Sequence, residues 1–271
     1  MTKLQLSKLH ATGNDFLVRV ALGDAAAPLL PDAVVALCDR HRGVGADGLL
    51  TLGRGGEGAD CTMVLQNADG GIAEMTGNGI RCLAWVAVRA GLGTTDTLVV
   101  DTGGGRRTIA LTRDSLGNVV AAEVDMGPVT FGRQDLEITV HGTTYRGDEA
   151  SIGNPHFVCF VDDPATARVV QHGRLIEHDT RFPNRTNVEF VRVLAPDEIE
   201  LRVWERGAGE TLSCGTGACA TVAVAHRRGL VGTDVRVRVP GGELHVRLGD
   251  TVRLGGPVVH VFDLDIDIAG A

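Results

Sequence analysis

One cysteine stands where a thiol could carry acid and base chemistry. Cys214 precedes Gly215-Thr216-Gly217, and the small apolar run that follows predicts a helix over 217–228. The positive end of a helix dipole stabilises a thiolate, so we expect a lowered pKa for Cys214 and a role as base or nucleophile. The alternative is that the side chain only packs as a small hydrophobic group. We apply that second interpretation to four other cysteines: Cys38, Cys61, Cys82 and Cys219.

An acidic and a basic residue lie shortly before this cysteine, in a stretch rich in turn formers. Glu205 and Arg206 precede Cys214 by nine and eight residues. Their spacing alone leaves two interpretations open. They either belong to a site with the cysteine or form a solvated surface pair.

The start of this helix occurs twice in the chain. The segment 75–79 returns 138 residues later as 213–217, and each opens a helix-like run that ends in Gly-Leu. A second match, 13–18 with 153–158, follows in the same order, so the chain contains an internal duplication. Free backbone N–H groups at two helix starts would suit a carboxylate or phosphate, and we expect a ligand between the halves. Alone, each Gly-x-Gly could also be a tight entry to a buried helix.

The elements around these helix starts predict an α+β fold. The run 78–90 is apolar on nearly every side, which is typical of a buried helix, and Gly91 is expected to end it. Most other segments alternate like strands, so we expect a curved sheet wrapped around one central helix. The second copy is expected to begin near Asp125, with a helical stretch between 164 and 178.

Composition narrows the class of protein. With 271 residues, 44% of them hydrophobic, the chain is long enough for two domains. We expect no membrane span and no signal peptide, and six sparse cysteines suggest free thiols in the cytoplasm. No spacing of Cys and His predicts a metal site. The net charge of -8, with scattered basic residues, argues against nucleic acid as a partner.

Several motifs together resemble the diaminopimelate epimerase family. They span almost the whole chain in order and occupy 9–16, 43–48, 67–70, 77–82, 153–156, 205–211 and 214–217. The resemblance implies an enzyme without cofactor that inverts one α-carbon of diaminopimelate, a precursor of lysine and peptidoglycan. It also implies two pseudo-symmetric domains, each a β barrel around a central helix. We expect one domain at 1–123, joined by a returning strand at 259–271, and the other at 124–258.

The resemblance also assigns roles to residues. In that family two cysteines face opposite sides of the α-carbon, and Cys214 matches the second, with Glu205 as its acid/base partner. His156 matches the partner of the first cysteine, whose place is taken here by Thr76. The expected ligand is a small diamino dicarboxylic acid. The positions that match the substrate-binding set are Asn14, Asn67, Gly77, Asn78, Asn154, Asn187, Glu205, Arg206, Gly215 and Thr216.

Thr76 departs from the family pattern in the chemistry itself, because a hydroxyl is far less acidic than a thiol. Three accounts fit: a variant inactivated to trap substrate; a natural threonine, with a water or His156 serving that face; or a different reaction on an amino acid, such as racemisation or dehydration. A protein that binds an amino acid without catalysis is a fourth. The oligomeric state is left open, with a homodimer as the candidate.

Overall fold

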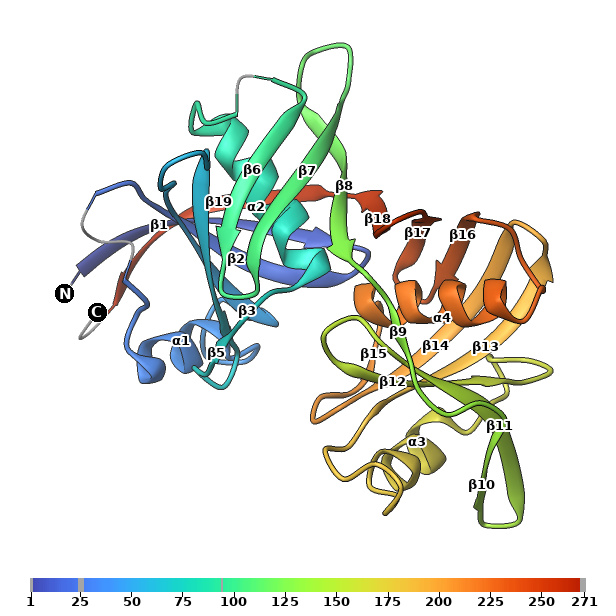
Figure 1. Cartoon of the computed structure of the whole chain (residues 1–271). Helices are drawn as coiled ribbons and strands as arrows, with labels where there is room; N and C mark the ends of the chain where they lie inside the picture. The colour runs from blue at the N-terminus through green and yellow to red at the C-terminus, as the bar shows by residue number, and fades with distance from the viewer. Residues whose placement is uncertain (1, 24–26, 94, 269–271) are drawn as a thin grey trace. The chain divides into compact units, whose positions relative to one another are not determined.

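The computed structural model describes residues 2–23, 27–93 and 95–268 and is built mainly from strands, with four helices in this part of the chain (Figure 1). It divides into two compact units, one of residues 1–124 with 256–271 and the other of residues 125–255. The expected breaks at 123/124 and 258/259 differ from these by one and three residues. Residues 269–271 of the expected returning strand lie outside the described residues. The last described strand, β19 (Val259–Ile268), pairs antiparallel with β1 (Thr2–Ala11).

The first unit surrounds one buried helix, α2 (Gly77–Arg89), with strands. This helix packs against four of them, β1 to β4 (Figure 1). A shorter helix, α1 (Pro31–Cys38), starts with a proline, whose missing N–H is no loss at a helix start. The remaining strands are β2 (Asn14–Ala21), β3 (Gly48–Arg54), β4 (Cys61–Asn67), β5 (Ile72–Ala73), β6 (Thr97–Thr102), β7 (Gly105–Arg113) and β8 (Val119–Gly127).

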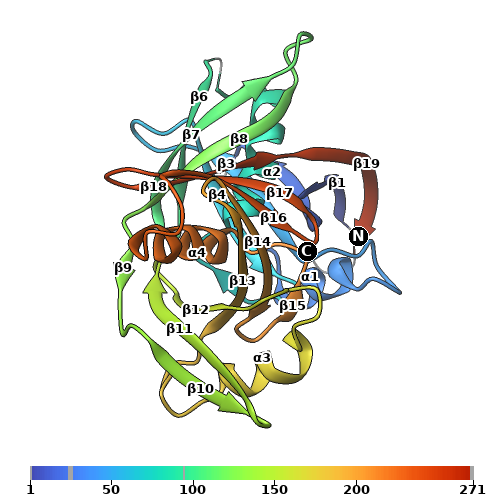
Figure 2. The ribbon, with the colours of Figure 1, turned by 90° about the vertical axis from the view of Figure 1, so that its right-hand side faces the viewer.

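The second unit has the same plan around α4 (Gly215–Arg227), which packs against β11 to β14 and β17 (Figure 2). A shorter helix, α3 (Val169–Glu177), covers β13 and β14 from another side. The strands of this unit are β9 (Thr130–Phe131), β10 (Leu136–Val140), β11 (Thr143–Ser151), β12 (Pro155–Phe160), β13 (Asn187–Ala195), β14 (Glu198–Glu205), β15 (Gly209–Thr211), β16 (Asp234–Val239), β17 (Gly242–Leu248) and β18 (Val252–Pro257).

Strand pairing repeats from one unit to the other. In the first, β2 pairs parallel with β3 and β4 parallel with β6, while β3–β4 and β6–β7 are antiparallel. In the second, β12–β13 and β14–β16 are parallel, while β13–β14 and β16–β17 are antiparallel. Each pair of parallel strands is joined through a helix, as such a connection requires. The predicted α+β class and the duplication are therefore confirmed.

The two central helices end in the same way. Gly91 and Gly229 adopt the left-handed conformation with φ of 80° and 72°. The following Leu92 and Leu230 donate their N–H groups to carbonyls five residues back, at 2.9 and 3.0 Å. This is the Schellman motif, in which glycine is favoured because it lacks a Cβ. Ten of the thirteen residues of each helix are buried, so both helices form the centres of their units.

Five described strands were not predicted from the sequence: β5, β9, β11, β15 and β18. The longest of these is β11, in which polar residues obscure the alternation that would mark its buried face. Its Gly147 must be glycine, because a Cβ there would lie 2.2 Å from the carbonyl oxygen of Val158. Asp148 is buried through bonds from Arg228, with Nε to Oδ2 at 2.9 Å. Both features depend on partners distant in sequence, so no local alternation shows them.

Candidate active site

The candidate acid/base residues Thr76 and Cys214 are the N-caps of α2 and α4. Thr76 Oγ1 accepts a hydrogen bond from the Gly79 N–H at 3.3 Å, and Cys214 Sγ accepts one from the Gly217 N–H at 3.4 Å. Both cap residues have extended backbone, as N-caps do, so each helix starts one residue later. The starts at Gly77 and Gly215 are one and two residues earlier than predicted. The expectation that both helix starts meet one ligand stays a prediction.

The Cys214 thiol is buried, with 5% of the residue exposed. Burial raises its pKa well above the usual value, and the nearby carboxyl groups of Glu205 and Glu189 raise it further. Hydrogen bonds from the Thr216 side chain and the Gly217 N–H act in the opposite direction but do not compensate. The predicted lowering of this pKa was therefore wrong, because desolvation and two acidic neighbours outweigh the helix start. The free protein holds Cys214 as a protonated thiol.

His156 and Glu189 form a buried pair in the second unit. Nδ1 of His156 lies 2.7 Å from Oε1 of Glu189, and neither side chain is exposed (0% each). The other ring nitrogen, Nε2, lies 3.0 Å from Oδ1 of Asn154, whose Nδ2 donates to Thr216 Oγ1 at 3.3 Å. Burial raises the pKa of Glu189, against the effect of His156. His156 is thus linked through Asn154 and Thr216 to the start of α4.

Two buried side chains, Asn187 and Glu177, form hydrogen bonds with the turn that carries Glu205 and Arg206. Asn187 Oδ1 accepts the Arg206 N–H at 2.9 Å, and its Nδ2 donates to the carbonyl of Pro155 at 2.8 Å. Glu177 accepts from the indole of Trp204 at 2.7 Å and from the Gly207 N–H at 3.0 Å. Glu205 Oε1 accepts from the Thr211 hydroxyl at 2.5 Å. These bonds fix the turn next to the α4 start.

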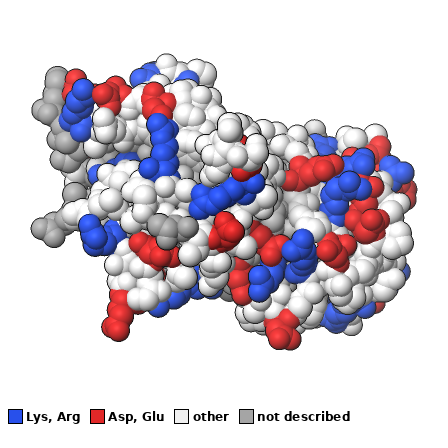
Figure 3. Space-filling view, turned by 90° about the horizontal axis from the view of Figure 1, so that it is seen from above, with Lys and Arg blue, Asp and Glu red and all other residues white. Residues whose placement is uncertain are grey.

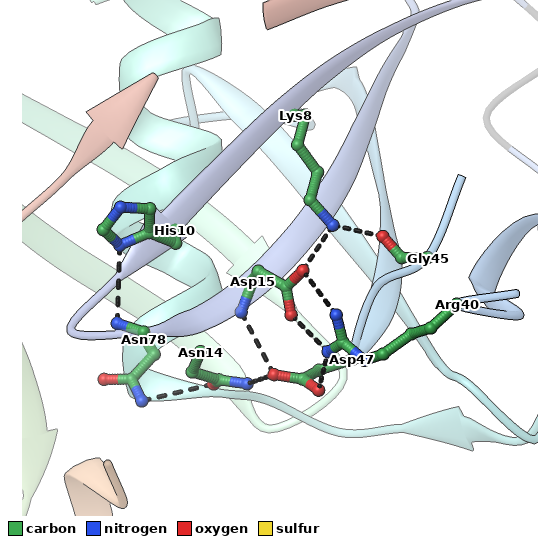
Figure 4. Close-up of polar contacts among 9 residues, drawn as sticks. Lys8, His10, Asn14, Asp15, Arg40, Gly45, Asp47 and Asn78 are labelled. Atoms are coloured by element: carbon green, nitrogen blue, oxygen red, sulfur yellow. Dashed lines mark hydrogen bonds and ion pairs between the residues drawn. The ribbon is translucent and has the colours of Figure 1, made fainter. Parts of the chain in front are cut away.

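In the first unit, the candidate residues Asn14 and Asn78 contact each other. Asn78 Nδ2 donates to Asn14 Oδ1 at 3.2 Å, and Asn14 Nδ2 donates to Asp47 Oδ2 at 2.6 Å (Figure 4). Arg40 bridges Asp47 and Asp15, at 2.7 and 2.6 Å.

Lys8 completes this network with bonds to Asp15 and the Gly45 carbonyl. Burial alone raises the pKa of Asp15, but hydrogen bonds from Arg40 and Lys8 outweigh it and lower the pKa to about 2. The network orients the amide of Asn14. The side chain of Asn67 is exposed at the end of β4.

The predicted site residues thus fall into two groups. Cys214, Glu205, His156, Asn154, Asn187, Arg206, Gly215 and Thr216 belong to the second unit, and Asn14, Asn67, Thr76, Gly77 and Asn78 to the first. Sequence reasoning missed Glu189, Glu177 and the partners of Asn14. Glu189 had one signal: it is an acidic residue inside the apolar run Val188 to Val191.

The four cysteines that were expected only to pack, Cys38, Cys61, Cys82 and Cys219, behave as packed thiols, and so does Cys159. All are buried, and burial raises the pKa of Cys38 to about 11 and those of Cys61 and Cys82 to about 12. Within the described residues, no group of three or more His, Cys, Asp or Glu side chains could hold a metal ion. No helix in that part of the chain is long and apolar enough to cross a membrane. Basic and acidic side chains are interspersed on the face drawn in Figure 3.

Comparison with known proteins matches most of the chain to one family. The family model described as diaminopimelate epimerase matches residues 6–132 and 149–259. The diaminopimelate epimerase of Synechococcus elongatus is 39% identical, over 98% of this chain and 99% of the relative. That of Pelotomaculum thermopropionicum is 39% identical, over 96% of this chain and 97% of the relative.

Solved structures of lower identity share the fold. A hydroxyproline epimerase from Agrobacterium vitis, with bound trans-4-hydroxy-L-proline, has a TM-score of 0.75 at 17% identity, and the match covers 98% of this chain and 91% of that one. A PhzF-family protein of Bacillus anthracis has a TM-score of 0.74 at 14% identity, covering 99% of this chain and 100% of that one. These matches agree with the duplicated α+β plan.

Proposed function

Because this chain belongs to the diaminopimelate epimerase family, we propose that it interconverts LL- and meso-2,6-diaminopimelate by proton transfer at one α-carbon. The observation that carries this proposal is the setting of Cys214: a buried thiol at the N-cap of α4, close to Glu205. A thiol and a carboxylate in such a place can exchange a proton without any cofactor. The reaction would serve the synthesis of lysine and peptidoglycan precursors.

The protonation state of the resting thiol sets the order of events. Since Cys214 is protonated, it is ready to donate a proton to a carbanionic α-carbon. To remove a proton instead, the thiol must first pass its own to a neighbouring base, and Glu205 is the candidate. The two directions use the same groups in reverse order. N–H groups at the start of α4 would stabilise negative charge on the substrate carboxylate.

Thr76 would make the two faces of the reaction unequal. Its hydroxyl already accepts the Gly79 N–H at 3.3 Å, and among the described residues no hydrogen bond joins it to a base. An unassisted hydroxyl is a weak acid and a weaker base than a thiolate. We therefore assign proton transfer chiefly to the Cys214 face, with His156 or a bound water as the alternative on the other.

The proposed substrate-binding groups suit a ligand with two amino acid heads. Amide side chains offer both donors and acceptors, and Arg206 offers a bidentate fork for a carboxylate. The set consists of Asn14, Asn67, Asn154, Asn187 and Arg206, with backbone at Gly77, Asn78, Gly215 and Thr216. Asn187 has both ends of its amide engaged by the protein, so at most one N–H and one lone pair of Oδ1 remain for a ligand.

The asymmetry of Thr76 and Cys214 favours a second candidate, a protein that binds the amino acid with little or no inversion. A racemase, epimerase or dehydratase for another amino acid is the third. We also propose a cytoplasmic location, since none of the six cysteines forms a disulfide, and a homodimer as the assembly.

A substrate panel tests the proposal. LL-diaminopimelate, meso-diaminopimelate, L-proline and trans-4-hydroxy-L-proline would each be incubated with the protein in deuterated water. Mass spectrometry would measure α-proton exchange, chiral chromatography the configuration, and calorimetry the binding. We expect both diaminopimelate isomers to bind and one of them to exchange its α-proton, and we expect neither binding nor exchange for the two prolines. Binding without exchange would favour the second candidate, and turnover of a proline would replace diaminopimelate as the substrate.

A further inference from the structure

A chain of hydrogen bonds leads from the Cys214 sulfur to a buried carboxyl group that has no assigned role. Sγ lies 3.5 Å from Thr216 Oγ1, which accepts from Asn154 Nδ2 at 3.3 Å. Asn154 Oδ1 lies 3.0 Å from His156 Nε2, and His156 Nδ1 lies 2.7 Å from Glu189 Oε1. All five residues belong to the second unit, so the chain is a property of that unit alone.

The groups along this chain fix the direction of each bond. Asn154 Oδ1 can only accept, so His156 Nε2 must carry a hydrogen. His156 Nδ1 then either accepts from a protonated Glu189 or donates to an ionised one. Both states leave the hydrogen on Nε2, and burial of the pair disfavours states with a net charge.

The direction at the other end follows. Because Thr216 Oγ1 accepts from Asn154, its own hydrogen is free to point at Cys214 Sγ. The sulfur then has two donors, the Thr216 hydroxyl and the Gly217 N–H at 3.4 Å. Two donors stabilise the thiolate relative to the thiol and so ease its transient formation in a buried site.

We propose that Glu189 is a positioning residue for Cys214. It holds His156 with a hydrogen on Nε2, and through Asn154 it makes the Thr216 hydroxyl donate to the sulfur. The assignment deepens the proposed function and rests on it only in treating Cys214 as the acid/base residue. Among the described residues Glu189 makes no hydrogen bond to the sulfur, and its second oxygen, Oε2, is buried without a partner there.

A simpler electrostatic role would have the opposite consequence. Glu189 of β13 and Glu205 of β14 are the carboxyl groups that raise the pKa of the thiol within its unit, and His156 of β12 lies between Glu189 and Asn154. A methyl group on Gly217 would lie 2.8 Å from Glu189 Oε1 and 3.3 Å from Cys214 Sγ, so only a glycine lets the two approach. If Glu189 acted only as a nearby negative charge, its removal would make the thiolate easier to form.

Alkylation of Cys214 by iodoacetamide separates these roles. Its rate, followed from pH 6 to 10 by mass spectrometry of the peptide containing Cys214, reports the thiolate fraction. Glu189→Leu should slow it about tenfold below the thiol pKa, the effect of losing one hydrogen bond to a charged group. Glu189→Gln keeps an N–H that can donate to His156 Nδ1, so it should stay within about twofold of the unmodified protein.

The control is Asp148→Asn, which neutralises an equally buried carboxylate of the same unit that pairs with Arg228. It should leave the alkylation profile unchanged. Faster alkylation in both Glu189 variants would show a role as charge alone, and equal slowing in both, or none in Glu189→Leu, would likewise overturn the proposal.

Two measurements do not depend on Glu189→Leu folding. In the unmodified protein, the ¹⁵N spectrum of the histidine side chains must show His156 protonated at Nε2, and an unprotonated Nε2 contradicts the chain. Thr216→Val should slow alkylation about tenfold below the thiol pKa, because it removes the hydroxyl that donates to the sulfur; an unchanged rate contradicts the chain. None of these readouts needs substrate, so the positioning role can hold while the proposed reaction fails, and the reverse.

Discussion

Thr76 and Cys214 occupy equivalent places in the two units, each capping the central helix and accepting the N–H of the glycine three residues on, at 3.3 and 3.4 Å. Both residues have the same extended backbone conformation and the same capping hydrogen bond, and only the capping atom differs. An oxygen replaces a sulfur at the place where the family resemblance puts the first of two acid/base groups. At this position the two halves therefore differ in the acid/base chemistry of the capping side chain and not in the way the backbone folds.

Thr76→Cys tests that divergence directly. The change is close in size and keeps an N-cap of the kind seen at Cys214, so stability should change little. Inversion of configuration should rise by about 10² to 10⁴, the usual contribution of one well-placed acid/base group. Chiral chromatography of the products measures it. Thr76→Ser is the control, and a comparable gain there would show that a thiol is not what the site lacks.

Arg206→Lys keeps the positive charge but loses the planar fork. If Arg206 binds a carboxylate, affinity for the ligand should fall about tenfold or more, because two parallel hydrogen bonds become one. Calorimetry measures the affinity. Arg192→Lys, an exposed arginine on β13, is the matched control. Unchanged affinity in Arg206→Lys would remove Arg206 from the binding set.

Gly217→Ala should disturb the surroundings of Cys214 through the size of the added methyl group alone, since the substitution changes no charge. The added methyl group would lie 2.8 Å from Glu189 Oε1 and 3.3 Å from Cys214 Sγ, so one of them must move. We expect a loss of stability of about 1 to 3 kcal/mol, as for an overpacked core, together with at least a tenfold loss of proton exchange. Chemical denaturation and exchange rates measure the two. Gly56→Ala, where the nearest atom lies at 3.6 Å, should change neither.

The ionisation of Asp15 should make the free energy of unfolding depend on pH in the acid range. Its pKa is lowered from 3.8 to about 2 in the folded protein, against its burial, by Arg40 and Lys8. A lowered pKa means that its contribution is fully present above pH 4 and is lost as the pH falls towards 2. In Asp15→Asn the free energy of unfolding should be lower at pH 7 and fall less steeply over that window. The exposed Asp250→Asn should keep the steep fall, and a steep fall in both would exclude Asp15 as its source.

The sequence predicted the plan of the fold because the duplication repeats local signals. Helix starts at glycines, a Gly-Leu ending and apolar helices all lie within short stretches of chain. The pKa of Cys214 could not be predicted that way, since it depends on burial and on Glu189 and Glu205. Glu189 comes close to Cys214 only when β12 and β13 pair in parallel, with Val158 opposite Glu189. Strand β11 was missed for the same reason, because its buried Asp148 needs Arg228 from another element.

We propose that Cys214 is the residue of this protein that carries fast proton transfer at the α-carbon. The most direct measurement incubates LL- and meso-diaminopimelate separately in deuterated water and reads deuterium content and configuration together over time. We predict that deuterium enters one isomer much faster than its configuration changes, that the other isomer stays largely inert, and that Cys214→Ala abolishes exchange. Equal inversion of both isomers at ordinary enzymatic rates would contradict the claim and show that a second base acts in place of Thr76.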